Sequence, residues 1–262
     1  DPDRVIVTSG TSPGILLALS SFLEEGDEVL LPNPHYACYP QFINFVGAEP
    51  AYVDVHEETG YELEPEQVSL RVGPRTKAIL INSPANPTGR VTDGEVIKQL
   101  ASIGPMIISD EIYHGLVYEG KEHTVLEYTD DAFVLNGFSK LYSMTGWRLG
   151  YIITPPRYQR LIQKMQQNFF IAANTFVQWA GIAALKEAQP DVDRMVRCFN
   201  ERRKLILRLI RDIGFKVIKE PTGAFYVLAN AKRYTDDSLA FAFEVLEEAH
   251  VGIAPGIDFG SN

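Results

Sequence analysis

Lys140 lies in the segment whose residue types are best suited to covalent chemistry. It follows Ser139 and a short apolar run. Arg148 comes eight residues later, between two glycines. An amine among apolar side chains loses hydration, which disfavours the ammonium form and lowers the pKa. A neutral amine can attack a carbonyl and form a Schiff base. Lys140 is therefore a candidate nucleophile, against the plainer interpretation of a solvated amine after a strand.

Ser139 and Arg148 add a second kind of chemistry to this segment. A hydroxyl and a guanidinium fork both suit a phosphate group, so the two side chains could serve one anion. An aldehyde for the lysine and a phosphate for its neighbours together describe pyridoxal phosphate. A purely structural strand and loop is the alternative for this segment.

Small residues at Ser9, Gly10 and Thr11 separate a short β-branched run, residues 5–7, from an amphipathic helical pattern. A strand, a small-residue turn and a helix in this order point free backbone N–H groups at an anion. The plainer interpretation is a helix N-cap supplied by Ser9 or Thr11. The turn alone does not distinguish these two roles.

Polar and aromatic side chains also follow three other predicted strands. Tyr36 could stack on a flat ligand ring or belong to the core. Asn86 lies in a loop stiffened by prolines, where ligands bind in open α/β sheets. Asp110 and Tyr113 follow a buried strand, and a carboxylate there needs a partner, which could be a helix N-terminus or a protonated pyridine nitrogen.

Apolar runs alternating with helical patterns predict an α/β fold built on seven strands. Thr92 and Glu95 have the spacing of a capping box that opens a helix running to about Ile103. The predicted strands cover residues 5–7, 28–31, 51–55, 78–81, 106–109, 133–136 and 151–154.

A change of pattern after residue 155 predicts a second, smaller domain. We expect a large domain over residues 1–190 and an incomplete α+β domain over residues 191–262. The many arginines of the helix at 191–213 are interpreted as a solvated face rather than a nucleic-acid surface. The predicted elements are helices at 157–167, 175–187, 191–213 and 239–249 and strands at 215–218, 224–228 and 251–254.

Composition narrows the classes of function. The 262 residues carry a formal net charge of −10, which argues against a nonspecific nucleic-acid binder. Two distant cysteines, Cys38 and Cys198, form no zinc or redox motif and fit a reducing cytoplasm. No metal site is expected. No membrane span is expected either, because no apolar run approaches 18 residues. The first and last residues suggest that both ends of a longer polypeptide are missing.

Several loops together, in the right order and spacing, resemble the fold-type I, pyridoxal-phosphate-dependent aminotransferases of class I/II, the aspartate aminotransferase-like family. The resemblance covers nearly the whole chain, and it implies a seven-stranded, mostly parallel sheet flanked by helices. The matching segments are residues 9–11, Tyr36, residues 82–89, residues 110–113, residues 139–140 and residues 146–150.

The resemblance implies a role for each matching residue. Lys140 would form the Schiff base with pyridoxal 5'-phosphate and then move the substrate's α-proton. Asp110 would keep the pyridine nitrogen protonated, and Tyr113 would complete the catalytic set. Asn86 and Tyr113 would hydrogen-bond the ring hydroxyl, Asn86 would also contact the substrate, and Tyr36 would stack on the ring. The phosphate would be held by Ser9, Gly10, Thr11, Ser139 and Arg148.

The resemblance further implies a homodimer that moves an amino group from an L-amino acid to a 2-oxo acid. Ser12 stands where some acidic-substrate members have a lysine, which weakens an aspartate assignment. The family's arginine for the substrate carboxylate would lie beyond Asn262. Two alternatives stay open: another enzyme with the same cofactor, such as a C–S β-lyase, or an aminotransferase-like effector domain of a transcription regulator.

Overall fold

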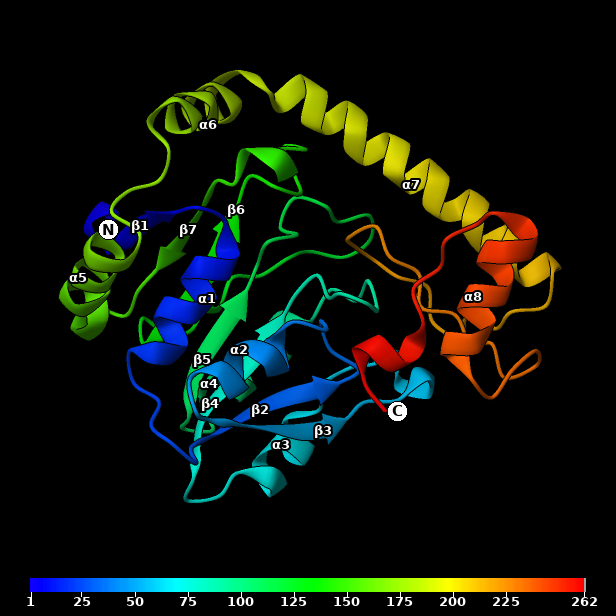
Figure 1. Ribbon diagram of the computed structural model, residues 1–262, viewed down its shortest axis with the longest axis horizontal. Helices are drawn as coiled ribbons and strands as arrows, with labels where there is room; N and C mark the ends of the chain where they lie inside the picture. The colour runs from blue at the N-terminus through cyan, green and yellow to red at the C-terminus, as the bar shows by residue number, and fades with distance from the viewer. Residues whose placement is uncertain (262) are drawn as a thin grey trace.

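Seven apolar runs pair into one sheet. The computed structural model describes residues 1–261, and the sheet order is β1-β7-β6-β5-β4-β2-β3 (Figure 1). Neighbouring strands are parallel except β7, which runs antiparallel to both β1 and β6. The strands are β1 (Val5–Thr8), β2 (Glu28–Asn33), β3 (Glu49–Asp54), β4 (Thr76–Asn82), β5 (Met106–Asp110), β6 (Ala132–Gly137) and β7 (Gly150–Ile153). The predicted seven-stranded, mostly parallel sheet is confirmed.

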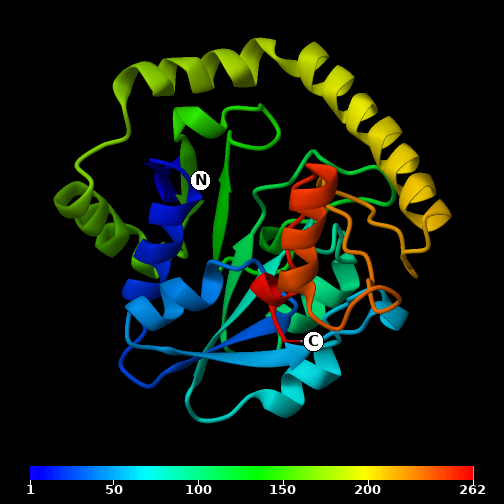
Figure 2. The same ribbon diagram turned by 45° about the vertical axis from the view of Figure 1, so that its right-hand side comes forward.

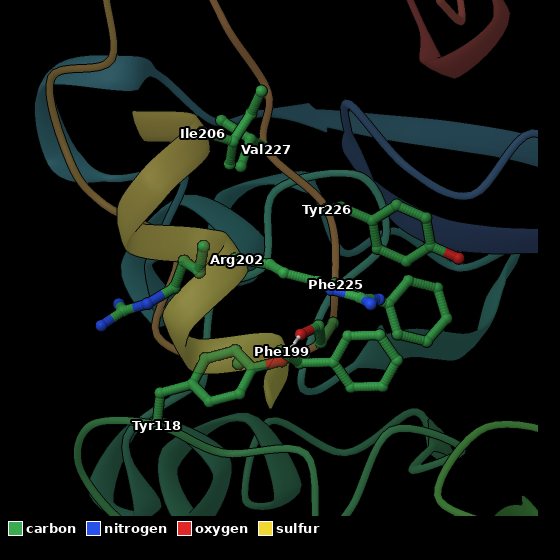
Figure 3. Close-up of a pocket in the computed structure, with 10 residues that line it drawn as sticks. Tyr118, Phe199, Arg202, Ile206, Phe225, Tyr226 and Val227 are labelled. Carbon is green, nitrogen blue, oxygen red and sulfur yellow. Dashed lines mark hydrogen bonds between the residues drawn. The ribbon is translucent and has the colours of Figure 1, made fainter. Parts of the chain in front are cut away.

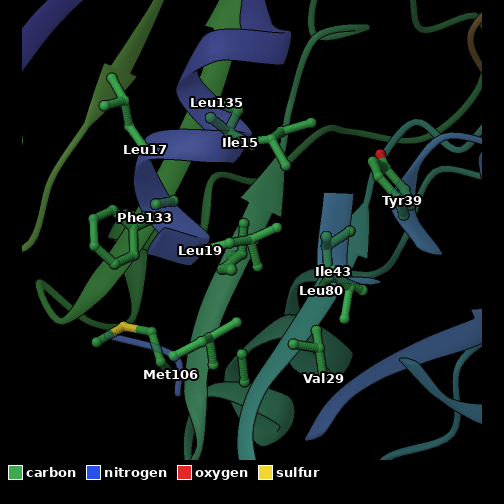
Figure 4. Packing of buried hydrophobic residues seen from close by; sticks show 14 of the residues in the cluster. Ile15, Leu17, Leu19, Val29, Tyr39, Ile43, Leu80, Met106, Phe133 and Leu135 are labelled. Carbon is green, nitrogen blue, oxygen red and sulfur yellow. The ribbon is translucent and has the colours of Figure 1, made fainter. Parts of the chain in front are cut away.

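Helices cover both faces of this sheet, which explains why its central strands carry apolar side chains on both faces. In β4, Ala78 and Leu80 point into one cluster while Ile79 and Ile81 point into the other. The first cluster is packed by α1 (Thr11–Ser20), α2 (Tyr39–Phe45) and α5 (Gln159–Phe169), and Figure 4 shows α1 side chains against β6. The second is packed by α3 (Pro65–Arg71) and α4 (Gly94–Ala101).

The start of α4 differs from the predicted capping box. Asp93 is the N-cap, and its Oδ1 accepts a hydrogen bond from the Glu95 N–H at 2.8 Å. Thr92 lies one residue too early, so the capping assignment to Thr92 is wrong. Asp93 is the cap because its backbone is extended and it lies directly before the first helical turn.

Helices dominate the chain after β7. They are α5, α6 (Thr175–Glu187), α7 (Gln189–Asp212) and α8 (Ser238–Ala249). Of these, α7 forms a long arm along the outside of the molecule (Figures 1 and 2). One arginine of α7 departs from the predicted solvated face. Arg203 is buried, donates to Pro221 O at 2.6 Å and pairs with Glu119 at 2.5 Å.

The strands predicted at 215–218, 224–228 and 251–254 do not form within residues 1–261. Within the first segment Lys216 forms a single bridge with Asn230, and Gly223, directly before the second segment, forms one with Val117. An apolar run becomes a strand only when a neighbour satisfies its backbone groups, and these segments lack one among the described residues. The domain division at residue 190 stays a prediction. None of the helices in the described chain has the length and apolarity to cross a membrane.

Candidate active site

The carboxyl ends of the parallel strands bring the predicted site residues to one edge of the sheet. Loops that follow β1, β2, β4, β5 and β6 each contribute, because parallel strands end on the same side. The predicted residues come from segments as far apart in sequence as Ser9 and Arg148.

Asp110 is the last residue of β5 and is buried. Its Oδ2 accepts a hydrogen bond from the Tyr39 hydroxyl at 2.8 Å, and its Oδ1 accepts one from the Ile112 N–H at 3.2 Å. Loss of hydration raises the pKa of the Asp110 carboxyl to about 6, and the two hydrogen bonds oppose that rise. The carboxylate is thus held in place with little solvent to stabilise its charge.

Tyr39 is a site residue that was not predicted from the sequence. Its ring is buried at the border of the first core cluster, and its hydroxyl points away from the aliphatic side chains (Figure 4). Burial next to Asp110 raises the pKa of Tyr39 well above its usual range, so the phenol stays a donor. Its position three residues after Tyr36 was the available signal.

Asn86 lies in the stiff loop that follows β4, and Asn82 fixes that loop to β5. Asn82 donates to Asp110 O at 2.8 Å and accepts from the Asn86 N–H at 2.7 Å. The Asn86 side chain is buried, and its Oδ1 has no hydrogen-bond partner among the described residues. A buried amide left unpaired is costly, so its place suits a polar group of a ligand.

Lys140 lies after β6 with its amine between aromatic rings. The Nζ atom is 5.4 Å from the ring centroid of Tyr113 and 5.6 Å from that of Phe225. Partial burial lowers the pKa of Lys140, while the charge of Asp110 opposes that effect and the charge of Arg148 adds to it. The amine is therefore electrostatically coupled to the carboxylate and to the guanidinium.

Tyr113 is buried, and its hydroxyl meets that of Tyr226 at 2.5 Å. Burial raises the pKa of both phenols above the usual range. Tyr226 belongs to a segment predicted only as a strand, so the sequence analysis missed it as a site residue. Nothing in the local pattern signals it, because its partner is more than a hundred residues away.

An anion cradle forms where α1 begins. Gly10 is the N-cap of α1, and neither Ser9 nor Thr11 supplies a side-chain cap, so the helix N-terminus keeps free N–H groups. A Cβ added to Gly10 would lie 2.5 Å from Arg148 Nη2, which places the guanidinium against this turn. Arg148 itself has a left-handed backbone, with φ of 55°. Ser9, Thr11 and Ser139 are half-buried.

Tyr36 is half-buried beside this group of residues. Its ring meets the Tyr39 ring edge-on, with centroids 5.2 Å apart. Burial raises the pKa of its hydroxyl, and the neighbouring Cys38 side chain and Asp110 carboxylate add to that rise. The ring is therefore a neighbour of the predicted pyridine partner.

A cavity of about 360 Å³ adjoins the site on the side of α7. It shares Phe225 and Tyr226 with the site, but neither Lys140 nor Asp110 lines it. Figure 3 shows the Phe225 and Tyr226 rings on one side of the segment and Arg202 directed away from them. The cavity is therefore distinct from the position of the candidate nucleophile.

Three features fit pyridoxal phosphate. The unpaired Asn86 oxygen marks a place for a polar ligand group, the uncapped N-terminus of α1 beside Arg148 suits a phosphate, and the Lys140 amine interacts with the charges of the buried Asp110 carboxylate and of Arg148. Each group suits one part of the cofactor: the Asn86 oxygen suits the ring's polar substituent, the start of α1 with Arg148 suits the phosphate, and the Lys140 amine suits the aldehyde.

Comparisons with known proteins identify the family of the chain. The chain is 44% identical over 264 residues to (5-formylfuran-3-yl)methyl phosphate transaminase of Methanocaldococcus jannaschii, covering 99% of this chain and 68% of that protein. It is 35% identical to an aspartate aminotransferase of Geobacillus stearothermophilus, covering 100% of this chain and 70% of the relative.

Solved structures match at the level of the fold as well. The aspartate aminotransferase of Thermus thermophilus with maleate superposes with a TM-score of 0.94 at 34% identity, over 99% of this chain and 69% of that one. The family model described as aminotransferase class I and II matches residues 1–261. The chain therefore belongs to the class I and II aminotransferases.

Proposed function

We propose that the chain moves an amino group from an L-amino acid to a 2-oxo acid with pyridoxal phosphate held at the carboxyl edge of its sheet. The observation that carries this proposal is the position of the Lys140 amine over the Tyr113 ring, where it interacts with the charges of buried Asp110 and of Arg148. When bound, the cofactor supplies a conjugated ring that accepts the electron pair left on the substrate's α-carbon.

Lys140 has two tasks in this proposal. Its Nζ would hold the cofactor through the aldehyde group in the resting enzyme, and the same amine, once the substrate amine has displaced it, would carry the substrate's α-proton. Partial burial, which lowers the pKa of Lys140, favours the neutral amine that both tasks need.

The other residues hold the cofactor's polar groups. Asp110 would accept a hydrogen bond from the ring nitrogen, and Tyr113 would donate one to the ring hydroxyl oxygen. Asn86 would also hydrogen-bond that oxygen and contact the substrate, and Tyr36 would pack against the ring. The phosphate would bind to the Ser9–Thr11 turn, Ser139 and Arg148. Free N–H groups at α1 and the guanidinium beside Gly10 support this assignment.

A homodimer completes the proposal. Large apolar side chains are exposed on and before α6, and they include Ile171, Phe176 and Trp179. A surface of this kind suits burial against a second copy of the chain. The cytoplasm is the proposed compartment, which the two free cysteines favour.

The test is covalent mapping of the cofactor. The protein is incubated with pyridoxal phosphate, its visible absorption is recorded, and borohydride reduction is followed by peptide mapping. We expect the label on Lys140, and no label in Lys140→Ala, which should still bind the cofactor noncovalently through the phosphate and ring contacts. Label on another lysine would overturn the assignment.

A panel of amino donors then tests the reaction type. Transamination predicts conversion of the absorbing cofactor to its amine form in the absence of a 2-oxo acid, with one equivalent of oxo acid released. Release of ammonia, or of a thiol from a cysteine conjugate, would instead indicate a lyase. Cofactor binding with no conversion by any donor would favour a regulatory domain.

A further inference from the structure

Tyr226 brings a phenol from the C-terminal third of the chain to the candidate active site. Its hydroxyl lies 2.5 Å from that of Tyr113, and the two rings meet edge-on with centroids 5.5 Å apart. Phe225 beside it lies near the Lys140 amine. One residue of this segment therefore faces the nucleophile while the next contacts the phenol that follows β5.

We propose that Tyr226 is a positioning residue that donates its hydroxyl proton to Tyr113 Oη and thereby directs the proton of Tyr113 at the cofactor's ring oxygen. This rests on the proposed function. A phenol has one proton to donate. If Tyr113 donates to the cofactor, it cannot also donate to Tyr226, and a contact of 2.5 Å between two hydroxyls then requires Tyr226 to be the donor.

A chain of two donors is stronger than one, because each hydrogen bond polarises the next. Burial raises the pKa of both phenols, so both keep their protons near neutral pH and either can fill the donor role. The groups that face the pair are the Tyr36 phenol, the Asp110 carboxylate and the Lys140 amine, which lies over the Tyr113 ring.

Backbone contacts hold the Tyr226 segment independently of its hydroxyl. Thr222 and Gly223 each donate an N–H to Gly89 O, at 2.9 and 2.8 Å, so the segment lies against the loop that carries Asn86. Ala224 donates to Leu116 O at 2.8 Å, in the stretch that follows Tyr113. Removing one hydroxyl should therefore leave the ring where it is.

Tyr118 offers a matched control, because it contacts the same segment from elsewhere in the chain. Its hydroxyl donates to Ala224 O, two residues before Tyr226. Tyr118→Phe removes one phenol that steadies the segment, whereas Tyr226→Phe removes the one that reaches the site. A merely structural role of Tyr226 predicts the same effect from both variants.

The experiment is a pH titration of the visible absorption of the bound cofactor in the wild type, Tyr226→Phe, Tyr113→Phe, the double variant and Tyr118→Phe. With a weaker donor to the ring oxygen, the negative charge there is less stabilised and the chromophore holds its proton to higher pH. We expect Tyr226→Phe to raise the titration midpoint by a few tenths of a pH unit, and Tyr113→Phe to raise it further.

The double variant should titrate like Tyr113→Phe alone, because Tyr226 acts through Tyr113. Tyr118→Phe should titrate like the wild type. An unshifted midpoint in Tyr226→Phe, an equal shift in Tyr118→Phe, or an additive shift in the double variant would overturn the relay. Absence of any visible band in the wild type would overturn the proposed function itself, so the two failures are distinguishable.

Discussion

Asp110 shows how one buried carboxyl balances opposing effects. Loss of hydration disfavours its charge, and hydrogen bonds from Tyr39 and the Ile112 backbone recover only part of that free energy. A group whose pKa is raised in the folded protein makes folding less favourable once it ionises. The charge is tolerated at a cost to stability, which suits a residue kept for binding rather than for folding.

Asp110→Asn should therefore stabilise the cofactor-free protein at neutral pH. The unfolded chain releases the carboxyl proton near pH 4 and the folded protein near pH 6, so the free energy of unfolding of the wild type falls as pH rises through that window. The variant should gain up to about 3 kcal/mol at pH 7.5 and nothing near pH 3.5. Urea denaturation at the two pH values measures this.

An equal difference between the two proteins at both pH values would show that packing, not ionisation, decides the effect. The same variant should bind pyridoxal phosphate less tightly at pH 7.5, since a neutral amide replaces the partner of the ring nitrogen. Loss of affinity together with a gain in stability would separate the two roles of the carboxylate.

At the scale of elements, the turn between β1 and α1 depends on a residue without a side chain. Gly10 combines a left-handed backbone, with φ of 94°, and close contact with the Arg148 guanidinium. A side chain there would meet both a conformational penalty and a steric one. The helix N-terminus and the arginine can approach each other only because the residue between them is glycine.

Gly10→Ala should weaken binding of pyridoxal phosphate by roughly tenfold or more, because the new methyl group displaces the guanidinium. Gly26→Ala is the matched control: its φ is 83°, and an added Cβ meets nothing within 4 Å. Both variants should lose stability, but only the first should lose affinity in an absorption titration. Equal dissociation constants would contradict the contact with Arg148.

Two candidate caps at the start of α4 can be told apart by substitution. Asp93 makes the capping hydrogen bond, whereas the Thr92 side chain makes none at that helix. Asp93→Ala should lower the free energy of unfolding by about 1 kcal/mol. Thr92→Ala should change it by less than about 0.5 kcal/mol. Denaturant melts of both variants measure the difference, and the reverse ranking would favour the capping box predicted from the sequence.

At the scale of the molecule, the sheet is covered on both faces while α6 carries large apolar side chains that are exposed. Phe176 and Trp179 of α6 are 65% and 69% exposed, and Ile171 just before the helix is 81% exposed. Trp147 contacts the Phe176 ring and extends the same surface. A patch of large side chains of this kind marks an interface.

Trp179→Glu should separate the proposed homodimer, since a carboxylate would be buried without a partner. We expect sedimentation at twice the chain mass of 29.3 kDa for the wild type and a dissociation constant at least about tenfold weaker for the variant. Leu70→Glu is the control, because Leu70 is 80% exposed on α3. A monomeric wild type, or equal effects of both variants, would contradict the assignment of this face.

Sequence patterns predicted the sheet because its strands are short apolar runs buried on both faces, such as residues 78–81. They failed at 215–218 and 251–254, which contain Lys216 and Gly252 and which pair with no neighbouring strand within residues 1–261. They also missed Tyr39 and Tyr226. A hydroxyl's partner depends on which distant segments the fold brings together, and neither spacing nor composition contains that information.

The edge of the sheet has a consequence for how the chain is made. β1 pairs only with β7, and Val5 meets Ile153, roughly 150 residues later. At a synthesis rate of about 5–20 residues per second, β1 waits roughly 8–30 s on the ribosome for its partner. The turn that carries Gly10 is therefore synthesised well before it can be completed. Nascent chains stalled before residue 150 should leave this turn open to protease, and longer ones should protect it.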